Sequence, residues 1–183
     1  MVGQTPMSSM SSSSSSAPSA VAEQSENSSQ YVGFQIAGQE YAFRIEQIQE
    51  IVILEQVTTV PQVPECCEGV SNLRGAIIPI INLRKLFGLA PKVADADTRT
   101  IVVNFGGRTM GCTVDMVSQV IRIPDDSLQP ALETLVVDGA DYVVGFAKLE
   151  GRLMIVLDID TLLDPGQLNR IRQISIDPEA QTT

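Results

Sequence analysis

The chain has 183 residues, enough for one domain or for two small units that share a core. Its 12 basic and 22 acidic residues give a formal charge of −10, which argues against nucleic acid as a partner. The chain has no histidine, which excludes Ser-His-Asp and Cys-His catalysis, histidine-ligated zinc and a histidine phosphoacceptor.

Residues 1–30 differ in composition from the rest of the chain. They contain a run of six serines and no aromatic or basic residue, so we expect a disordered tail. The first basic residue is Arg44, so the positive region of a signal peptide is missing, and no apolar run is long enough to cross a bilayer. Cys66, Cys67 and Cys112 fit neither a disulfide framework nor a zinc spacing. We therefore expect a cytoplasmic protein with reduced thiols and no direct membrane insertion.

A mostly β domain is predicted from Tyr31 to about Pro165. Short runs rich in Val, Ile and Leu alternate there with Gly, Pro, Asn and Asp, which is typical of strands separated by turns. The predicted strands include Tyr31–Ile36, Ile51–Leu54, Ala76–Ile81, Thr100–Phe105, Tyr142–Phe146 and Leu153–Ile159. Short helices are expected at Leu83–Phe87 and Asp160–Leu163, and residues 166–183 are expected to hold a C-terminal helix, at Gln167–Ile174, and a frayed end.

The sequence of this domain repeats itself. At an offset of 69 residues, Phe34–Gly38 aligns with Val103–Gly107, and the apolar positions that follow also match. At an offset of 76 residues, Gly69–Gly75 aligns with Gly145–Gly151, and the apolar runs after them match as well. Agreement in the same order across both halves indicates a duplication.

The repeat predicts two similar β units. Each unit has a hairpin that turns at Gly38 or at Gly106-Gly107, then a glycine-bounded turn that leads into an apolar strand such as Ile77–Ile81. Units of this size have thin cores when they stand alone. We therefore expect two packed small β-barrels, approximately residues 31–94 and 95–165.

Few side chains of the chain suggest catalysis. Asp158 and Asp160 resemble a carboxylate pair, but they lie where a strand ends and a short helix begins, which is where a helix cap is expected. A small acidic enzyme that uses Glu50, or Asp158 and Asp160, remains the alternative from a different functional class. Such an enzyme would need a bound metal or a pH-dependent activity.

Glu50 and Arg74 stand out from their apolar surroundings. Glu50 lies within an apolar run, and the repeat places the uncharged Gln119 opposite it. Arg74 lies just before the most hydrophobic strand of the chain. A guanidinium there could pair with a carboxylate or anchor an interface, although a solvated turn residue is equally compatible with the spacing.

The longest motif of the chain resembles the signature of the CheW-like adaptor domain of bacterial chemotaxis. It consists of Gly69–Gly75 followed by Pro79–Gly88, with supporting matches at Tyr41–Ile45, Ile48–Ile51 and Thr113–Ser118. The resemblance covers about Tyr31 to Pro165 and implies two intertwined five-stranded SH3-like β-barrels, with strands exchanged between the barrels. Asn82 departs from the pattern, because the family usually has Asp at this position.

The resemblance implies a non-enzymatic adaptor that needs no cofactor. Such adaptors join the cytoplasmic tips of methyl-accepting chemoreceptors to the regulatory domain of a CheA-type histidine kinase, in arrays beside the membrane. The residues that match the receptor groove are Ile48, Glu50, Gly69, Arg74 and Ile77. The residues that match the kinase-facing side are Ile53, Gln56, Val57 and Val60.

Two further points follow from the sequence. The same fold could serve twitching motility or a second-messenger pathway, whereas a fragment of a larger kinase is disfavoured because the tails carry no second domain. Residues 121–165 hold nine acidic and three basic residues, so most of the negative charge lies in the second half of the domain. The nearly neutral first half is left for partner contact.

Overall fold

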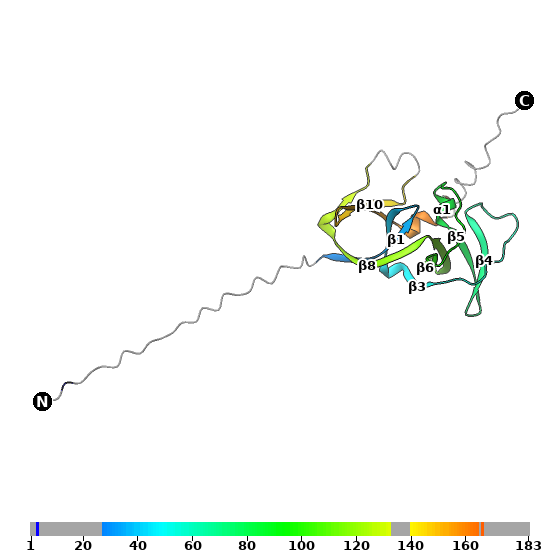
Figure 1. The fold of residues 1–183 in the computed structure, drawn as a ribbon, viewed down its shortest axis with the longest axis horizontal. Coiled ribbons are helices and arrows are strands. Elements are labelled where there is room, and N and C mark those ends of the chain that lie inside the picture. Colours follow the sequence, from blue (N-terminus) through cyan, green and yellow to red (C-terminus); the bar gives the residue numbers. More distant parts are fainter. Residues whose placement is uncertain (1–2, 4–26, 133–139, 165, 167–183) are drawn as a thin grey trace, which may run out of the picture.

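A computed structural model describes residues 3, 27–132, 140–164 and 166 (Figure 1). Most of the disordered tail expected at residues 1–30, namely residues 1–2 and 4–26, and the helix expected at Gln167–Ile174 lie outside the described residues. The first strand begins at Ser28, so the folded domain starts before the expected Tyr31.

The described chain is mostly β, as predicted. Its strands are β1 (Ser28–Ile36), β2 (Gln39–Arg44), β3 (Ile48–Val52), β4 (Cys67–Leu73), β5 (Ala76–Asn82), β6 (Arg99–Phe105), β7 (Arg108–Val114), β8 (Met116–Pro124), β9 (Leu128–Pro130), β10 (Val143–Leu149) and β11 (Arg152–Leu157). Its helices are α1 (Leu83–Leu86), α3 (Ile159–Leu162) and the 3-10 turns η1 (Ile45–Gln47) and η2 (Asp125–Ser127). Both short helices therefore lie close to where the sequence predicts them.

One prediction about local structure is wrong. Gly69–Gly75 and Gly145–Gly151 were each expected as a glycine-bounded turn, but most of each segment is a strand, β4 or β10. Gly69 and Ser71 are the buried residues of β4 and alternate with more exposed ones, as in a strand. Small residues, which are also typical of turns, are needed here because the backbone of Thr58 lies against Gly69. Only two residues form the turn itself in each hairpin.

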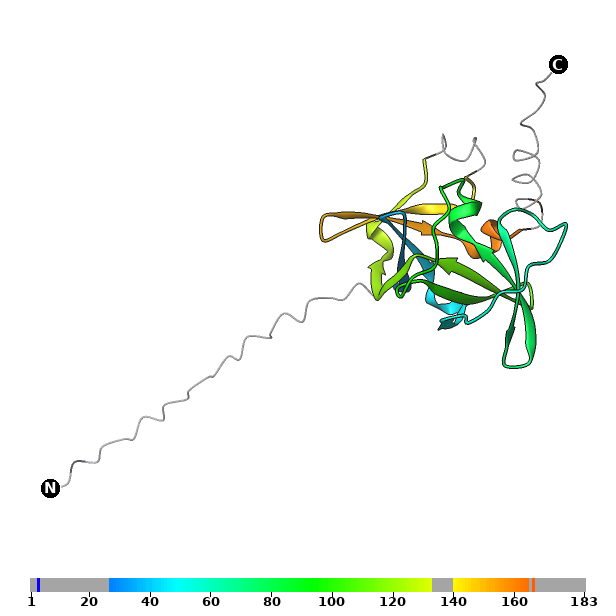
Figure 2. The same ribbon diagram turned by 45° about the vertical axis from the view of Figure 1, so that its right-hand side comes forward.

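The strands form two sheets that each combine both halves of the sequence. The first sheet has the order β8-β1-β2-β11-β10-β9, and the second has the order β3-β6-β7-β5-β4. Strands β1 and β2 thus pair with strands from the second half, and β6 and β7 pair with strands from the first. Figures 1 and 2 show the two sheets side by side, with β8 extending from one to the other.

The duplication seen in the sequence is present in the sheet order. In the repeat, β3 corresponds to β8, β6 to β1, β7 to β2, β5 to β11 and β4 to β10. The corresponding strands follow one another in the same order in both sheets, and only the short β9 has no partner strand. The register agrees as well, because Ile80 pairs with Gly111 in one sheet and Val156 pairs with Ala42 in the other. The two barrels are therefore structural repeats that have exchanged hairpins.

Four hairpins end in the same kind of two-residue turn. The turn residues Ala37-Gly38, Arg74-Gly75, Gly106-Gly107 and Glu150-Gly151 all have positive φ, between 49° and 88°. Two successive residues with positive φ define the type I′ turn, whose twist matches that of paired strands. Arg74 and Glu150 occupy equivalent positions in their hairpins, and both adopt a conformation that L-residues rarely take.

Two glycines allow a second segment to cross close to each long hairpin. A Cβ on Gly69 would lie 2.0 Å from the carbonyl oxygen of Thr58, and one on Gly145 would lie 2.3 Å from that of Gln129. Gln129 belongs to β9, and Thr58 makes the corresponding single bridge to Val70 in the other barrel. The glycines are thus required for edge pairing in both repeats.

The largest apolar cluster is shared between the two sheets. It includes Phe34 and Phe43 from the first sheet, Ile101 and Cys112 from the second, and Leu162 from α3. Five aromatic rings stack in series through this region, with centroid separations of 4.7–5.9 Å, in the order Phe43, Phe34, Tyr41, Phe87 and Tyr142. A smaller cluster fills each barrel separately. Among the described helices, none is long and apolar enough to span a membrane.

We predict that Gly145→Ala destabilises the protein by about 1–3 kcal/mol, because the added methyl group meets backbone that cannot move without breaking the β9–β10 pairing. Urea denaturation monitored by circular dichroism measures the change. Gly33→Ala is the matched control, since its Cβ would have ordinary contacts at 3.4 Å. Equal midpoints for the two variants would contradict the role assigned to Gly145.

Candidate functional site

Glu50 and Arg74 form a bidentate ion pair at the surface. Arg74 donates from Nη1 to Glu50 Oε1 at 3.0 Å and from Nη2 to Glu50 Oε2 at 2.6 Å. The Arg74 side chain is 76% exposed, whereas that of Glu50 is 24% exposed. The guanidinium is therefore held in one orientation while most of its surface remains available to a partner.

The local fold explains why these two residues meet. Strands β3 and β4 are the two edges of the five-stranded sheet, and Arg74 lies in the turn that follows β4. Glu50 lies at an irregularity in the register between β3 and β6. The ion pair thus connects the two sheet edges on the outside of the barrel, above its small core of Ile78, Ile80 and Val102.

The other residues expected at the receptor groove differ in exposure. Ile77 is 64% exposed and lines an apolar groove of about 540 Å³ with Phe105, Met110 and Leu163. Ile48 is half-buried and packs against the large shared cluster. Gly69 is buried beneath Thr58, so it can influence a contact surface only through the position of that segment.

The residues expected on the kinase-facing side lie on the segment that crosses β4. Ile53 is 67% exposed, and it lines a second cavity, of about 390 Å³, together with Gln56 and Leu73. Ser71 Oγ donates to the carbonyl oxygen of Gln56 at 2.8 Å, which fixes the segment on β4. Val57 packs on the barrel core, and Val60 is half-buried further along the segment.

The β4–β5 hairpin lies between the two predicted surfaces. Ile77 on β5 lines the apolar groove, whereas Asn72 and Leu73 on β4 line the cavity beside Ile53. Arg74, in the turn of the same hairpin, holds Glu50. The structure therefore places residues of the two predicted sets along one hairpin, with the groove beside β5 and the cavity beside β4, so a short physical path joins the two hollows.

Among the groove-lining residues, only Ile77 was identified as a site residue from the sequence. Phe105 and Met110 come from the β6–β7 hairpin, and each faces the groove beside Ile77. They align with Ile36 and Tyr41 in the repeat, both of which pack in or on the shared core, so apolar character alone gives no indication of exposure. The strand exchange is what places this hairpin next to β5.

Asn82 has a specific role that an aspartate could not fill. Its Oδ1 accepts from the backbone N–H of Lys85 at 3.2 Å, which caps α1 as Asp158 caps α3 in the repeat. Its Nδ2 donates to Glu68 Oε1 at 2.6 Å. An aspartate would keep the cap but would face the Glu68 carboxylate, so the asparagine removes a repulsion between two acidic groups.

The carboxylates considered for catalysis have structural partners. Asp158 Oδ2 accepts from the Thr161 hydroxyl at 2.6 Å, and Asp160 accepts from the Gln47 side chain at 3.1 Å. Glu50 is occupied by Arg74. Among the residues that the structure describes, no group of three His, Cys, Asp or Glu side chains could hold a metal ion.

Comparison with known proteins adds independent information. The family model of the CheW-like domain matches residues 30–166. The chemotaxis protein CheW of Klebsiella aerogenes is 35% identical over 146 residues, which are 80% of this chain and 88% of that protein. The CheW of Helicobacter pylori is 37% identical over 141 residues, 77% and 85% of the two chains. The crystal structure of the scaffolding protein TtCheW from Thermoanaerobacter tengcongensis matches with a TM-score of 0.68 and 32% identity, covering 75% of this chain and 94% of that one.

We predict that the three thiols differ in reactivity toward iodoacetamide. Burial raises the pKa of Cys112 to about 12 and also raises that of Cys66, so both stay protonated and unreactive at pH 8. Cys67 is only half-buried and is expected to be alkylated first. Peptide mass spectrometry of folded and urea-unfolded protein measures this, and rapid modification of Cys112 in the folded protein would contradict its burial.

Proposed function

Because the chain belongs to the CheW-like family of chemotaxis scaffold proteins, we propose that it joins the cytoplasmic tips of methyl-accepting chemoreceptors to the regulatory domain of a CheA-type histidine kinase. It is an adaptor rather than an enzyme, and it acts in chemotaxis signalling. The observation that supports the proposal is the juxtaposition of an apolar groove beside β5 and a second cavity beside β4, along one hairpin.

The receptor is proposed to bind at the groove beside Ile77 and at Arg74. The groove is lined mainly by apolar side chains, and a helical receptor tip would bury its own apolar face there. Arg74 would supply the charged contact. Because the ion pair with Glu50 already restricts the Arg74 side chain, less conformational entropy would be lost when a partner binds. An exposed apolar patch that is flanked by an oriented arginine is typical of an interaction site.

The kinase regulatory domain is proposed to bind at the β4 side of the hairpin, beside the segment that crosses this strand. Ile53 is the most exposed large apolar side chain of this face, and Gln56 beside it offers a polar edge. The backbone of the segment is anchored at Thr58 and Gln56, so its surface is presented in a defined shape. Association with arrays beside the membrane would follow from these two contacts, with no membrane contact by the chain itself.

Coupling between the two partners is proposed to pass through the hairpin. A receptor that moves Ile77 or Arg74 displaces β5 or its turn, and β4 carries the displacement to the segment that holds Ile53. Receptor states that bind the groove with different affinity would thereby shift the adaptor's affinity for the kinase, since coupling between sites is reciprocal. Each contact alone would be modest, and many adaptors in one array would supply avidity.

We predict that Arg74→Glu abolishes co-sedimentation of the protein with receptor-containing membranes while the protein remains folded. The variant places two carboxylates together and removes the oriented guanidinium. The loss of a pair this exposed is expected to change the free energy of unfolding by less than about 1 kcal/mol.

Arg152→Glu is the control for this experiment. Arg152 is 75% exposed and pairs with Glu40 at 3.3 Å, so the substitution has a similar effect on charge and breaks a similar surface pair away from the groove. It is expected to leave co-sedimentation unchanged. Full receptor binding by a folded Arg74→Glu protein would remove Arg74 from the proposed site.

We predict that Ile53→Glu weakens binding of the kinase regulatory domain at least about tenfold and leaves receptor co-sedimentation intact, because a charge would be buried in the apolar centre of the contact. Isothermal titration calorimetry with the isolated regulatory domain measures the change. Val93→Glu serves as the control, since Val93 is equally apolar and is exposed in the loop between α1 and β6. A simultaneous loss of receptor binding would show that the two surfaces are not separate.

A further inference from the structure

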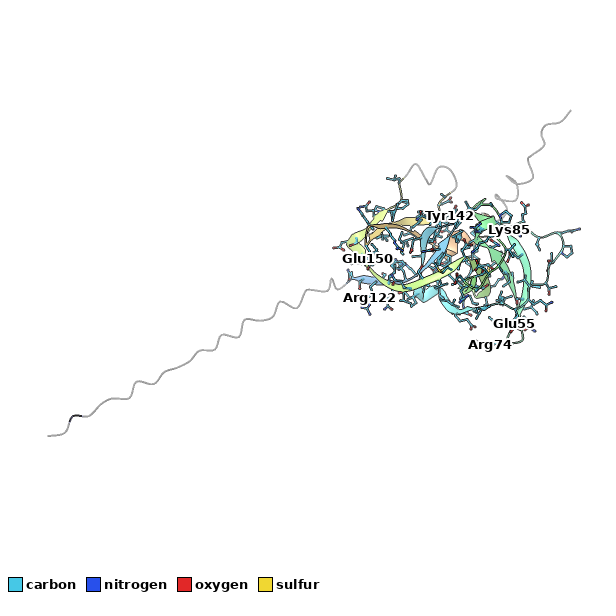
Figure 3. All side chains as sticks on the ribbon, in the orientation of Figure 1. Glu55, Arg74, Lys85, Arg122, Tyr142 and Glu150 are labelled. Carbon is cyan, nitrogen blue, oxygen red and sulfur yellow. The ribbon has the colours of Figure 1, made fainter. Side chains whose placement is uncertain are left out.

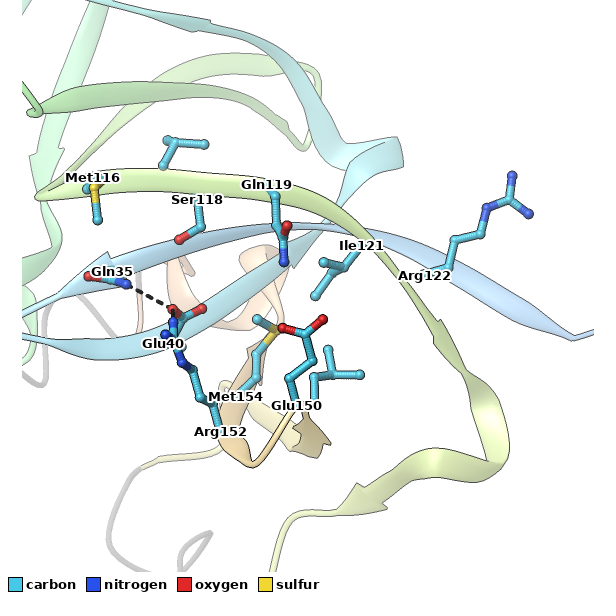
Figure 4. A pocket seen from close by; sticks show the side chains of 12 residues that line it. Gln35, Glu40, Met116, Ser118, Gln119, Ile121, Arg122, Glu150, Arg152 and Met154 are labelled. Carbon is cyan, nitrogen blue, oxygen red and sulfur yellow. Dashed lines mark hydrogen bonds and ion pairs between the residues drawn. The ribbon is translucent and has the colours of Figure 1, made fainter.

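The barrel of the six-stranded sheet contains a cavity at the place where the barrel of the five-stranded sheet has its ion pair. The cavity has a volume of about 570 Å³, within the range of ligand-binding sites, and lies between β8, the β10–β11 hairpin and the ends of β1 and β2 (Figure 4). Its side chains include Gln119, Ile121, Glu150 and Met154. None of the residues proposed to bind the receptor or the kinase lines it.

The repeat identifies the cavity as the counterpart of the Glu50–Arg74 site. Gln119 on β8 aligns with Glu50 on β3, and Glu150 aligns with Arg74 as the first residue of the same type I′ turn. The two turns lie on opposite sides of the molecule, as Figure 3 shows for Arg74 and Glu150. In the barrel of the five-stranded sheet, the Arg74 guanidinium connects the two edge strands through Glu50. The other barrel has the Gln119 amide and the Glu150 carboxylate at the equivalent positions, and neither of them is a cation.

Glu150 has no partner among the residues that the structure describes. Figure 4 shows its carboxylate inside the cavity, with the Gln119 amide pointing toward it from the opposite wall. Of the two arginines on the rim, Arg152 pairs with Glu40 at 3.3 Å, and the Arg122 guanidinium extends away from the cavity to within 3.3 Å of the Gln30 amide. Glu150 is thus the uncompensated charge that faces the cavity.

The walls of the cavity suit an arginine side chain. Ile121 and Met154 would pack against its aliphatic stem, and the Glu150 carboxylate would accept from its guanidinium. The Gln119 amide, whose nitrogen faces Glu150 in Figure 4, would accept through its oxygen after a half-turn of its end group. The charged residues that line the cavity are Glu40, Arg122, Glu150 and Arg152, and Glu150 alone among them has no partner in the part of the chain that the structure describes. An anionic group would instead meet Glu150 and Glu40.

We propose that this cavity is an additional interaction site that receives an arginine side chain from a partner protein, held between Gln119 and Glu150 as Arg74 is held by Glu50 in the other barrel. The proposal does not depend on the adaptor function, because it concerns a surface outside the receptor and kinase contacts. It assigns a third contact to the protein, through a loop or strand end that carries an exposed arginine.

The peptide Ac-Ala-Arg-Ala-NH2 tests the chemistry directly. Titrated into the isotopically labelled full chain and followed by NMR, it should shift the signals of Gln119, Ile121, Glu150 and the Met154 methyl group, in a saturable manner. The citrulline peptide of the same shape should bind at least about tenfold more weakly, because it lacks the charge. Shifts spread over the whole acidic surface, or equal binding of the citrulline peptide, would overturn the proposal.

Two variants locate the site. Glu150→Gln should weaken binding of the arginine peptide at least about tenfold, whereas Asp126→Asn, which removes one negative charge from an exposed position of the same barrel, should not change it. Equal effects of the two variants would reduce the interaction to general electrostatic attraction. Tighter binding of agmatine than of the peptide would assign the cavity to a small amine and overturn the protein partner.

The double variant Gln119→Glu, Glu150→Arg provides a test that does not rely on loss of a group. It gives the barrel of the six-stranded sheet the Glu–Arg pair found in the barrel of the five-stranded sheet, and its net charge change equals that of Asp126→Asn. The new arginine should occupy the cavity and block the peptide, leaving the NMR signals of Met154 unchanged on titration. Undiminished peptide binding by this folded variant would show that the equivalent position is not where the arginine binds.

Discussion

In each of the four hairpins, two successive turn residues with positive φ determine how the strands pair. The type I′ turn fixes the register of its two strands, and the register decides which side chains face the barrel core. In the β4–β5 hairpin it buries Ile78 and Ile80 and leaves Ile77 exposed. The turn also holds Arg74 at a place from which it reaches Glu50 on the far edge of the sheet. The core and the proposed contact surface thus depend on the same local geometry.

The exchange of hairpins makes the two barrels one cooperative unit. The β1–β2 hairpin pairs with β8 and β11, and the β6–β7 hairpin pairs with β3 and β5, so neither barrel can form from one half of the chain. The shared apolar cluster and the stacked rings that end at Tyr142 lie between them. A rigid junction of this kind suits an adaptor. Because the interior is closely packed, a displacement of strands in one barrel is transmitted to the other barrel.

The sequence predicted the β class, the duplication, the hairpin turns and both short helices, because these depend on local patterns and on glycine. It could not predict the course of β4, since the segment from Gly69 to Leu73 is rich in small and polar residues and becomes a strand only through contact with Thr58. The ion pair of Glu50 and Arg74 was anticipated from two isolated charges and the family motif. The groove formed by Phe105 and Met110 was not, because it arises from the strand exchange, which is a long-range property.

The duplication places side chains of opposite charge at equivalent positions of the two barrels. Arg74 and Glu150 share a backbone conformation and a place in the hairpin, and both side chains lie largely outside the core. An exposed ion pair contributes less than about 1 kcal/mol to stability, so the loss of one in either repeat would cost the fold little. The turn, the paired glycines and the buried alternation of the strands are shared by both repeats, whereas these two charged positions differ. Because the fold depends little on the charge at these positions, the difference between the repeats bears on what each surface can contact rather than on stability.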